Sequence, residues 1–401
     1  MLREASSSAA IARARPEDLG MSSDRLRSLG ERLNEDVQRQ RLPGAVALVA
    51  RHGRVVHFEA YGTRDPNAGE PMQLDTIFRV HSMTKPIVSV AAMMLVEAGR
   101  LDLADPLSLY LPAFRHTLVA QVSGERLDRI PTVRPILIHD LFRHTSGLAY
   151  EWLAEGPTRR LYAEAQTERR DRTNAERCDV LAGLPLLAQP GTRWIYGRST
   201  DVLGRVIEVV ADESLGEHLR NRVFAPLGML ETGFHVPSEQ WHRLAEPFAI
   251  DPDSGAAVTL FDVRRAVAFE NGGGGLVSTT TDYSRFLRMV ENGGACGGVR
   301  LVSPATLDFM LCDHLGPEVE IGPEFLPPGY GFGLGFAVRR TTGIAPFPGT
   351  AGDVFWEGLG GTNFWIDRAR GLHAILMIQA PGRRAHYRSL FRQLVYAALT
   401  E

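Results

Sequence analysis

The run Ser82-Met83-Thr84-Lys85 carries a serine and a lysine at a spacing that suits nucleophilic catalysis. A serine hydroxyl becomes a good nucleophile when a nearby base takes its proton. Residues three apart lie on the same face of a helix, and a lysine becomes a base when desolvation and neighbouring positive charge lower its pKa. Because serine and lysine also occur at this spacing by chance, the rest of the sequence has to support the assignment.

An apolar stretch directly after this pair predicts a buried helix. Residues 87–96 are apolar on all sides, and Gly99 ends the run. Inside a helix the ring of Pro86 would clash with the carbonyl group of residue 82, so the helix cannot begin much before Ser82. We therefore expect Ser82 at the helix N-terminus, where backbone N–H groups and the helix dipole favour an anion.

The wider pattern predicts an α+β fold with an antiparallel sheet built from both chain ends, flanked by helices, and with an inserted, mainly helical lobe. Helices are expected after Ser22 and Ser23 and over residues 386–399. Strands are expected over residues 45–51, 54–61, 332–340, 362–367 and 372–379. Residues 1–19 are predicted to form a flexible tail. Residues 20–401 are predicted to form one domain, with an α/β lobe over about 20–99 and 266–401 and a helical lobe over about 100–265.

Composition narrows the class of protein. The formal net charge is -3, with 44 basic and 47 acidic residues mixed throughout, which argues against binding to nucleic acid or to an anionic membrane. The sequence has no run of eighteen apolar residues, so a membrane span is not expected. The N-terminus lacks the apolar core of a signal peptide. The three cysteines are far apart and are interpreted as free thiols, so a cytoplasmic location is expected.

Several segments around the pair together resemble a known family. They are residues 76–86, residues 141–148, Asp201-Val202-Leu203-Gly204 and Gly272-Gly273-Gly274-Gly275-Leu276. In this order they resemble class C β-lactamases and, most closely in motif, the related family VIII carboxylesterases. The resemblance covers roughly residues 20 to 400 and implies a β-lactamase/penicillin-binding-protein-like fold. It also implies that Ser82 is the nucleophile and Lys85 a proton-transfer group.

The resemblance implies a third catalytic residue, Tyr196, in the run Trp194-Ile195-Tyr196-Gly197-Arg198. The tyrosine at this place in the family shuttles the proton to and from the leaving group. A phenol beside an ammonium group can have a lowered pKa and act as general base and then acid. β-Lactamases usually carry Tyr-x-Asn, whereas Arg198 occupies the asparagine position here and is assigned to substrate binding. This departure argues against β-lactam hydrolysis.

The Lys-Thr-Gly element of β-lactamases is also absent. Trp356-Glu357-Gly358, followed by Leu359-Gly360-Gly361, stands in its place and resembles the Trp-Gly-Gly-type run of the esterases. Without the lysine, a positive charge for a β-lactam carboxylate is lost, and the tryptophan favours uncharged, apolar esters. Trp356, Glu357 and Gly358 are assigned to substrate binding, although for Glu357 a solvated strand residue is the slightly favoured interpretation. By resemblance, the backbone N–H groups of Ser82 and Leu359 form the oxyanion hole.

Other motifs carry less weight. The glycines at 272–275 lack the ending of a phosphate-binding loop and are expected to allow close backbone packing. His144-Thr145-Ser146 is interpreted as a structural turn, because sequence neighbours rarely form a catalytic triad. G-x-S-x-G and H-E-x-x-H runs are absent, which argues against an α/β-hydrolase and a zinc protease. Neither a metal nor another cofactor is expected.

These observations predict a serine esterase that acts on small-molecule carboxylic esters, with short-to-medium acyl chains, through an acyl-enzyme. Three alternatives stay open: an acyltransferase with an alcohol or amine acceptor, a weak β-lactamase or D-peptidase, and a catalytically silent binding homologue. The intact set of Ser82, Lys85 and Tyr196 argues against the last. The sequence leaves the oligomeric state open.

Overall fold

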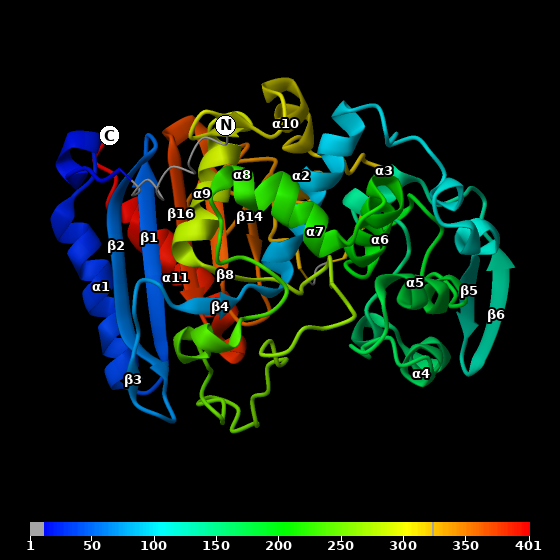
Figure 1. The fold of residues 1–401 in the computed structure, drawn as a ribbon, viewed down its shortest axis with the longest axis horizontal. Coiled ribbons are helices and arrows are strands. Elements are labelled where there is room, and N and C mark those ends of the chain that lie inside the picture. The colour runs from blue at the N-terminus through cyan, green and yellow to red at the C-terminus, as the bar shows by residue number, and fades with distance from the viewer. Residues whose placement is uncertain (1–11, 323–324) are drawn as a thin grey trace, which may run out of the picture.

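An eight-stranded antiparallel sheet forms the centre of the computed structural model, which describes residues 12–322 and 325–401 (Figure 1). Its order is β12-β13-β14-β15-β16-β1-β2-β3. The N-terminal strand β1 pairs with the C-terminal strand β16, so both chain ends share one sheet, as predicted. The strands are β1 (Gly44–Arg51), β2 (Arg54–Asp65), β3 (Glu70–Pro71), β12 (Tyr330–Phe332), β13 (Ala337–Arg339), β14 (Val354–Glu357), β15 (Asn363–Asp367) and β16 (Leu372–Ile378).

The sheet differs from the expectation in one place. The single strand expected over residues 332–340 is two antiparallel strands, β12 and β13. The chain reverses tightly between them, where Gly333 N–H donates to the carbonyl of Phe336 at 2.8 Å. A Cβ at Gly333 would lie 2.4 Å from the carbonyl oxygen of Met310, and Gly335 has a φ of 95°. Gly333 and Gly335 thus allow a turn within a segment whose alternation of apolar and polar residues predicts a single strand.

Helices cover both faces of the sheet, and every residue of β1 is therefore buried. Helices α1 (Ser23–Gln38) and α11 (Arg384–Ala397) pack together and contact β2 and β16 on one face. Helix α9 (Thr280–Glu291) covers β1, β15 and β16 on the other face, beside α2 (Thr84–Glu97) (Figure 1). The predicted start of α1 is confirmed, because the Ser22 side chain accepts a hydrogen bond from the backbone of Arg25.

A mainly helical region lies between α2 and the return of the chain to the sheet (Figure 1, cyan to green). Its longest helix, α6, packs directly against α2. Its elements are β5 (Leu118–Ser123), β6 (Arg126–Pro131), α3 (Ile138–Phe142), α4 (Gly156–Glu164), α5 (Asn174–Ala182), β7 (Arg193–Trp194), α6 (Ser199–Ala211), α7 (Leu215–Leu219), a π-helical turn (Arg220–Phe224) and α8 (Ala225–Leu227).

Short elements connect the two regions. Strand β4 (Ile77–Arg79), just before Ser82, pairs with β8 (Val277–Thr279), just after the glycine run. Strand β11 (Glu320–Ile321) pairs in parallel with β7 of the helical region. The remaining elements are β9 (Ala295–Cys296), β10 (Val299–Arg300) and α10 (Pro304–Met310).

Part of the predicted N-terminal tail is held against the sheet. Residues 1–11 lie outside the described residues. Ala14 N–H donates to the carbonyl of Val55, Val55 N–H donates to Ala12, and Pro16–Leu19 form a 3₁₀ turn. The side chain of Arg51 also donates to the carbonyls of Leu19 and Gly20. The expectation of a loose segment is therefore wrong for residues 12–19. None of the helices in the described ranges has the length and apolar character needed to cross a membrane.

Candidate active site

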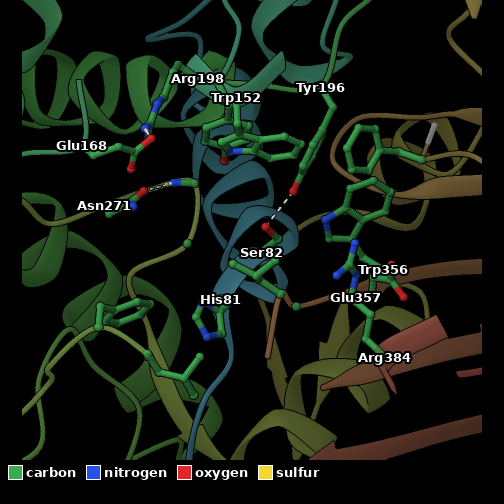
Figure 2. A pocket seen from close by; sticks show the side chains of 18 of the residues that line it. His81, Ser82, Trp152, Glu168, Tyr196, Arg198, Asn271, Trp356, Glu357 and Arg384 are labelled. Carbon is green, nitrogen blue, oxygen red and sulfur yellow. Dashed lines mark hydrogen bonds and ion pairs between the residues drawn. The ribbon is translucent and has the colours of Figure 1, made fainter. Parts of the chain in front are cut away.

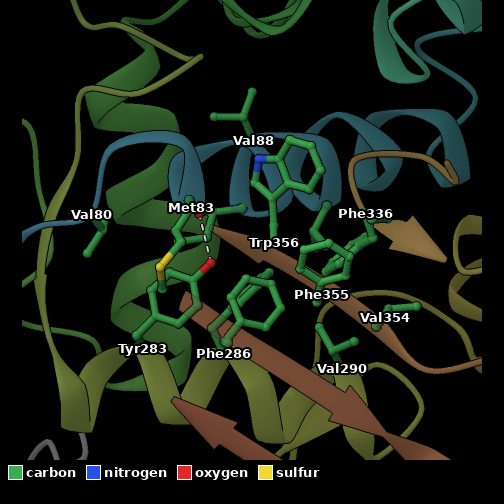
Figure 3. Close-up of a cluster of buried hydrophobic side chains, with 14 of the residues drawn as sticks. Val80, Met83, Val88, Tyr283, Phe286, Val290, Phe336, Val354, Phe355 and Trp356 are labelled. Atoms are coloured by element: carbon green, nitrogen blue, oxygen red, sulfur yellow. Dashed lines mark hydrogen bonds between the residues drawn. The ribbon is translucent and has the colours of Figure 1, made fainter. Parts of the chain in front are cut away.

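The segment that carries Ser82 is fixed from several sides. His81–Met83 form a 3₁₀ turn, and α2 begins at Thr84. The Tyr283 hydroxyl of α9 donates to the carbonyl of Met83 at 2.8 Å (Figure 3). Leu276 N–H, just before β8, donates to Thr84 Oγ1 at 3.1 Å. The helix start expected from Pro86 is confirmed, and the serine lies in the turn directly before α2.

His81 adopts a left-handed backbone conformation with a φ of 46°, which is uncommon for a residue other than glycine. Its ring is buried and packs edge-on against Phe261 at a centroid distance of 4.8 Å. Burial, together with nearby cations, lowers the pKa of His81 to about 3, so the imidazole is neutral at physiological pH. The strained turn presents the next residue, Ser82, to the cavity (Figure 2).

Three side chains meet at the serine oxygen. Lys85 Nζ lies 3.2 Å from Ser82 Oγ, and the Tyr196 hydroxyl donates to Ser82 Oγ at 2.6 Å (Figure 2). Lys85 Nζ also donates to the carbonyl of Gly273 at 2.5 Å and lies 3.0 Å from the Tyr150 hydroxyl. The structure therefore brings together the three residues that the sequence assigned to catalysis, and it adds Tyr150 as a further contact of the lysine.

The electrostatic environment makes Lys85 a base at neutral pH. The side chain is completely buried, and this desolvation lowers its pKa to about 7. The carboxylate of Asp201 acts in the opposite direction, and the guanidinium of Arg198 lowers the pKa further. A substantial fraction of the protein therefore holds an uncharged amine beside Ser82 at physiological pH.

Tyr196 behaves differently from the sequence expectation of a lowered pKa. Burial raises the pKa of its phenol above the ordinary value, although its contacts with Ser82 and Trp356 act in the opposite direction. The expected cause of a lowered pKa was a neighbouring ammonium group, but Lys85 itself loses much of its charge near pH 7. Tyr196 is thus a protonated donor at neutral pH, and the expectation of a lowered pKa is wrong.

Glycines allow the segments of the site to approach closely. A Cβ at Gly197 would lie 2.2 Å from the carbonyl oxygen of Leu148, so this glycine lets the Tyr196 segment pack on the segment that leads to Tyr150. A Cβ at Gly273 would lie 2.6 Å from Asp201 Oδ2. The close packing expected of residues 272–275 is confirmed, because Gly273 supplies a carbonyl to Lys85.

The turn after β14 approaches the nucleophile from the sheet. A Cβ at Gly358 would lie 2.5 Å from the carbonyl oxygen of Val80, and Gly361 N–H closes the turn onto Gly358 at 2.9 Å. Such a turn does not use the N–H of its second residue, here Leu359. Within the described ranges, neither Leu359 N–H nor Ser82 N–H has a backbone acceptor, and both residues line the same cavity.

That cavity has a volume of about 410 Å³ and contains the other residues assigned to substrate binding. Trp356 is buried, and its ring lies 5.3 Å from that of Tyr196. Glu357 is not a freely solvated strand residue, because its carboxylate pairs with Arg388 at 2.8 Å and its side chain is only 21% exposed. Gly358 completes this wall of the cavity.

Arg198 lies in the cavity wall, but acidic side chains of the protein already compensate the positive charge of its guanidinium. The guanidinium is 2% exposed, pairs with Glu168 (Figure 2), lies 3.9 Å from Asp201 and stacks 4.5 Å above the ring of Tyr150. Residues of the 150–177 and 259–274 segments form much of the remaining wall. They include Arg170 and Arg177, so the wall carries positive charge beside the aromatic surface of Trp356. Sequence spacing did not associate these arginines with Ser82.

The other candidate groups take structural roles. His144 has a φ of 56° in a buried turn, and Ser146 Oγ lies 2.8 Å from Ser199 Oγ, which fits the interpretation of this run as a structural turn. The three cysteines are free thiols, as expected. Within residues 12–322 and 325–401, His, Cys, Asp and Glu side chains do not gather in a group that could hold a metal ion.

Comparison with known proteins agrees with this geometry. A family model described as Beta-lactamase matches residues 29–398. The chain belongs to the beta-lactamase family. Among relatives of this family, esterase EstB of Burkholderia gladioli is 34% identical over 87% of this chain and 90% of its own length. Lovastatin esterase of Penicillium rubens is 32% identical over 85% and 89%.

A solved structure has the same fold. EstCE1, described as a hydrolase with promiscuous acyltransferase activity, superposes with a TM-score of 0.79 and is 30% identical, covering 93% of this chain and 98% of its own. The predicted β-lactamase/penicillin-binding-protein-like fold and the resemblance to esterases of the family are therefore confirmed. The chain is a serine hydrolase of the beta-lactamase family.

Proposed function

We propose that this protein hydrolyses carboxylic esters of small molecules through an acyl-enzyme on Ser82. The observation that carries the proposal is a buried lysine with a pKa of about 7 that lies 3.2 Å from a serine hydroxyl at the floor of a cavity. An amine with this pKa can accept the serine proton at neutral pH, which is the requirement for attack on a carbonyl. The names of EstB and lovastatin esterase support an ester as the substrate.

The proposed first step forms the acyl-enzyme. Ser82 Oγ bonds to the carbonyl carbon while Lys85 takes the hydroxyl proton. The N–H groups of Ser82 and Leu359 stabilise the oxyanion, each by about 3–4 kcal/mol. When the C–O bond to the alcohol breaks, Tyr196 gives its phenol proton to the leaving oxygen and is reprotonated by the proton that Lys85 took from Ser82, so Lys85 is again an uncharged amine in the acyl-enzyme.

The second step reverses the proton transfers. A water molecule attacks the acyl carbon and gives a proton to Lys85, the bond to Ser82 Oγ breaks, and the serine regains its proton. The free acid leaves, and Lys85 returns to its uncharged form.

Ser82→Ala tests this proposal. Hydrolysis of short-chain aryl esters is expected to fall by at least ~10³-fold, because the covalent route is lost. Ser89→Ala is a matched control on the same segment, since Ser89 is buried in α2 and its hydroxyl has no hydrogen-bond partner among the described residues. A serine-directed phosphonate should label wild type on Ser82, as seen by mass spectrometry. Unchanged turnover in Ser82→Ala would refute the assignment, and a missing adduct would favour a silent homologue.

Acyl transfer to an alcohol is the second candidate, and the description of EstCE1 favours it. The same acyl-enzyme would react with an alcohol in place of water. Product analysis with a competing alcohol separates the two outcomes, because transfer gives a new ester and hydrolysis gives only the acid.

β-Lactam or D-peptide cleavage has less support. Arg198 holds the asparagine position of β-lactamases, and its guanidinium is engaged by Glu168. A Lys-Thr-Gly run is absent from the C-terminal third of the sequence. Turnover of a chromogenic cephalosporin as fast as that of an aryl ester would reverse this order.

A further inference from the structure

Positive charge exceeds negative charge along the wall of the catalytic cavity. Four arginines line it, Arg170, Arg177, Arg198 and Arg384, together with two glutamates, Glu168 and Glu357. Each glutamate already pairs with an arginine, Glu168 with Arg198 and Glu357 with Arg388. Within residues 12–322 and 325–401, the other three arginines of the lining have no carboxylate oxygen within 4.0 Å. An unpaired charge in a partly buried wall is costly, which makes these groups candidates for ligand recognition.

Arg170 is the one of these arginines that is best placed to meet a ligand. Its guanidinium stacks 4.2 Å above the ring of Phe261, and its Nη2 is buried without a hydrogen-bond partner among the described residues. Phe261 in turn packs on His81, the residue before Ser82. Arg177 is less available, because it is 1% exposed, stacks on Phe269 and donates to the carbonyl of Arg169 at 2.8 Å.

The surroundings of Arg170 do not neutralise it. His81 is an uncharged imidazole at physiological pH. Asp262 acts on Arg170 only from a distance, since its carboxylate is 59% exposed and lies 3.6 Å from Arg264. Arg384, by contrast, lies on the opposite wall of the cavity. It is on the same side as Trp356 and the carboxylate of Glu357 (Figure 2). Negative charge on a ligand therefore fits best beside Phe261 and Arg170.

We propose that Arg170 recognises a carboxylate on the ester substrate, so that the preferred substrates are esters carrying a second, ionised carboxyl group. The inference rests on the proposed ester hydrolysis and names its substrate class. The carboxylate would accept hydrogen bonds from the guanidinium, including from the buried Nη2. The reacting ester group would lie at Ser82, on the other side of the Phe261 and His81 rings.

Matched ester pairs test this proposal. Mono-4-nitrophenyl esters of glutaric, adipic and suberic acids are compared with the 4-nitrophenyl esters of pentanoic, hexanoic and octanoic acids. The ratio of kcat/KM for the charged ester to that for the neutral ester of equal chain length is expected to exceed ~10 for at least one length, since a hydrogen bond to a charged group contributes about 1.5–3 kcal/mol. A second pair, 4-acetoxybenzoate and its methyl ester, tests a carboxylate on the alcohol side.

Two variants assign the effect to Arg170. Arg170→Gln should bring the ratio close to one, mainly through a higher KM for the charged esters. Arg169→Gln is the matched control, because Arg169 is the adjacent arginine, pairs with Asp171 on the surface and is not part of the cavity wall. Arg170→Glu should lower the ratio below one, because it places a negative charge opposite the carboxylate.

The outcomes separate the two proposals. If wild type hydrolyses neutral esters and shows no preference in either set, or if Arg170→Gln keeps the preference, the inference is wrong and ester hydrolysis stands. If wild type hydrolyses none of these esters, both proposals fail. A preference only in the benzoate pair keeps Arg170 as the recognition residue and assigns the carboxylate to the alcohol part of the substrate.

Discussion

Two kinds of cation lie in two regions around the catalytic cavity. At its floor, Lys85 is completely buried and has a pKa of about 7, so its charge can leave at neutral pH. In the cavity wall, Arg170 and Arg198 keep their charges, stacked on the rings of Phe261 and Tyr150. A lysine can give up its proton when it is desolvated, whereas an arginine cannot. Under the two proposals, this difference separates proton transfer at Ser82 from substrate recognition at the cavity wall.

The composition of the chain sharpens this comparison. Lys85 is the only lysine in the sequence, and all the other residues among the 44 Lys and Arg are arginines. Among the described residues, surface ion pairs are accordingly made by arginine, and so are the cation–π contacts other than those of Lys85 with Tyr150 and Tyr196. The one lysine lies 3.2 Å from Ser82 Oγ, where the proposed mechanism needs a proton acceptor. This signal was present in the sequence and would have supported Lys85 independently of its spacing from Ser82.

Lys85→Arg is expected to have the largest effect. The variant keeps a positive charge beside Ser82 but cannot accept a proton, so kcat should fall by at least ~10³-fold for charged and neutral esters alike. Raising the pH should not restore activity. An arginine variant that keeps more than a tenth of the wild-type kcat would remove Lys85 from the role of base.

The pH dependence of wild type provides the control for this assignment. The ammonium form of Lys85 is inactive and the amine form is active, so kcat/KM should rise with pH and level off above about 7. Because the chain has one lysine, protein labelled with ¹³C at lysine Cε should give one side-chain signal to follow by NMR. Its titration midpoint should match the kinetic one. A midpoint near the ordinary value of lysine would contradict the assignment.

Tyr150→Phe is expected to have an intermediate effect. The Tyr150 hydroxyl lies 3.0 Å from Lys85 Nζ, and its removal leaves the lysine with one contact fewer. The turnover number should fall by about 10-fold, because a single neutral hydrogen bond contributes about 1 kcal/mol and also orients the amine. The lost oxygen stabilised the ammonium form, so the acid limb of the pH profile should move to lower pH.

The pH profile and a control variant distinguish this positioning role from a general loss of stability. A destabilised variant would lose active protein without moving the pH profile. Tyr162→Phe is the control, because Tyr162 is also buried in the helical region but donates to the carbonyl of Pro185, away from Lys85. A Tyr150→Phe profile that coincides with wild type would show that Tyr150 does not act on the lysine.

The two regions also differ in how far the sequence could predict them. Local sequence signals predict the positions of Ser82 and Lys85. The two residues are one helical turn apart, and Pro86 limits where the helix can begin. The hairpin of β1 and β2 turns at His52 and Gly53, which both have positive φ, and was likewise predictable. The cavity wall has no such signal. It depends on tertiary packing between segments far apart in the sequence.

Tyr150 and Arg170 illustrate that limit. Tyr150 reaches Lys85 because the chain at Leu148 packs against Gly197, a contact between segments about fifty residues apart that no spacing encodes. Arg170 lies in a segment without periodicity, and its neighbour Phe261 comes from a second such segment. The raised pKa of Tyr196 was also out of reach, because it follows from burial by side chains that the sequence does not bring together.

Glu168→Gln is expected to have the smallest effect, and it acts in the opposite direction to Arg170→Gln. Glu168 neutralises Arg198 at the cavity wall, and its side chain is 59% exposed. Removing its charge increases the positive potential of the wall, so the preference for carboxylated over neutral esters should rise. Because the Glu168 side chain is exposed and its charge is screened by solvent, the change should contribute less than about 1 kcal/mol, so the expected increase in the kcat/KM ratio is about 2-fold. Glu164→Gln in α4 changes the same charge outside the cavity wall and should leave the ratio unchanged. A ratio that falls in Glu168→Gln would mean that Arg198 is held for packing on Tyr150, and that recognition by charge is confined to Arg170.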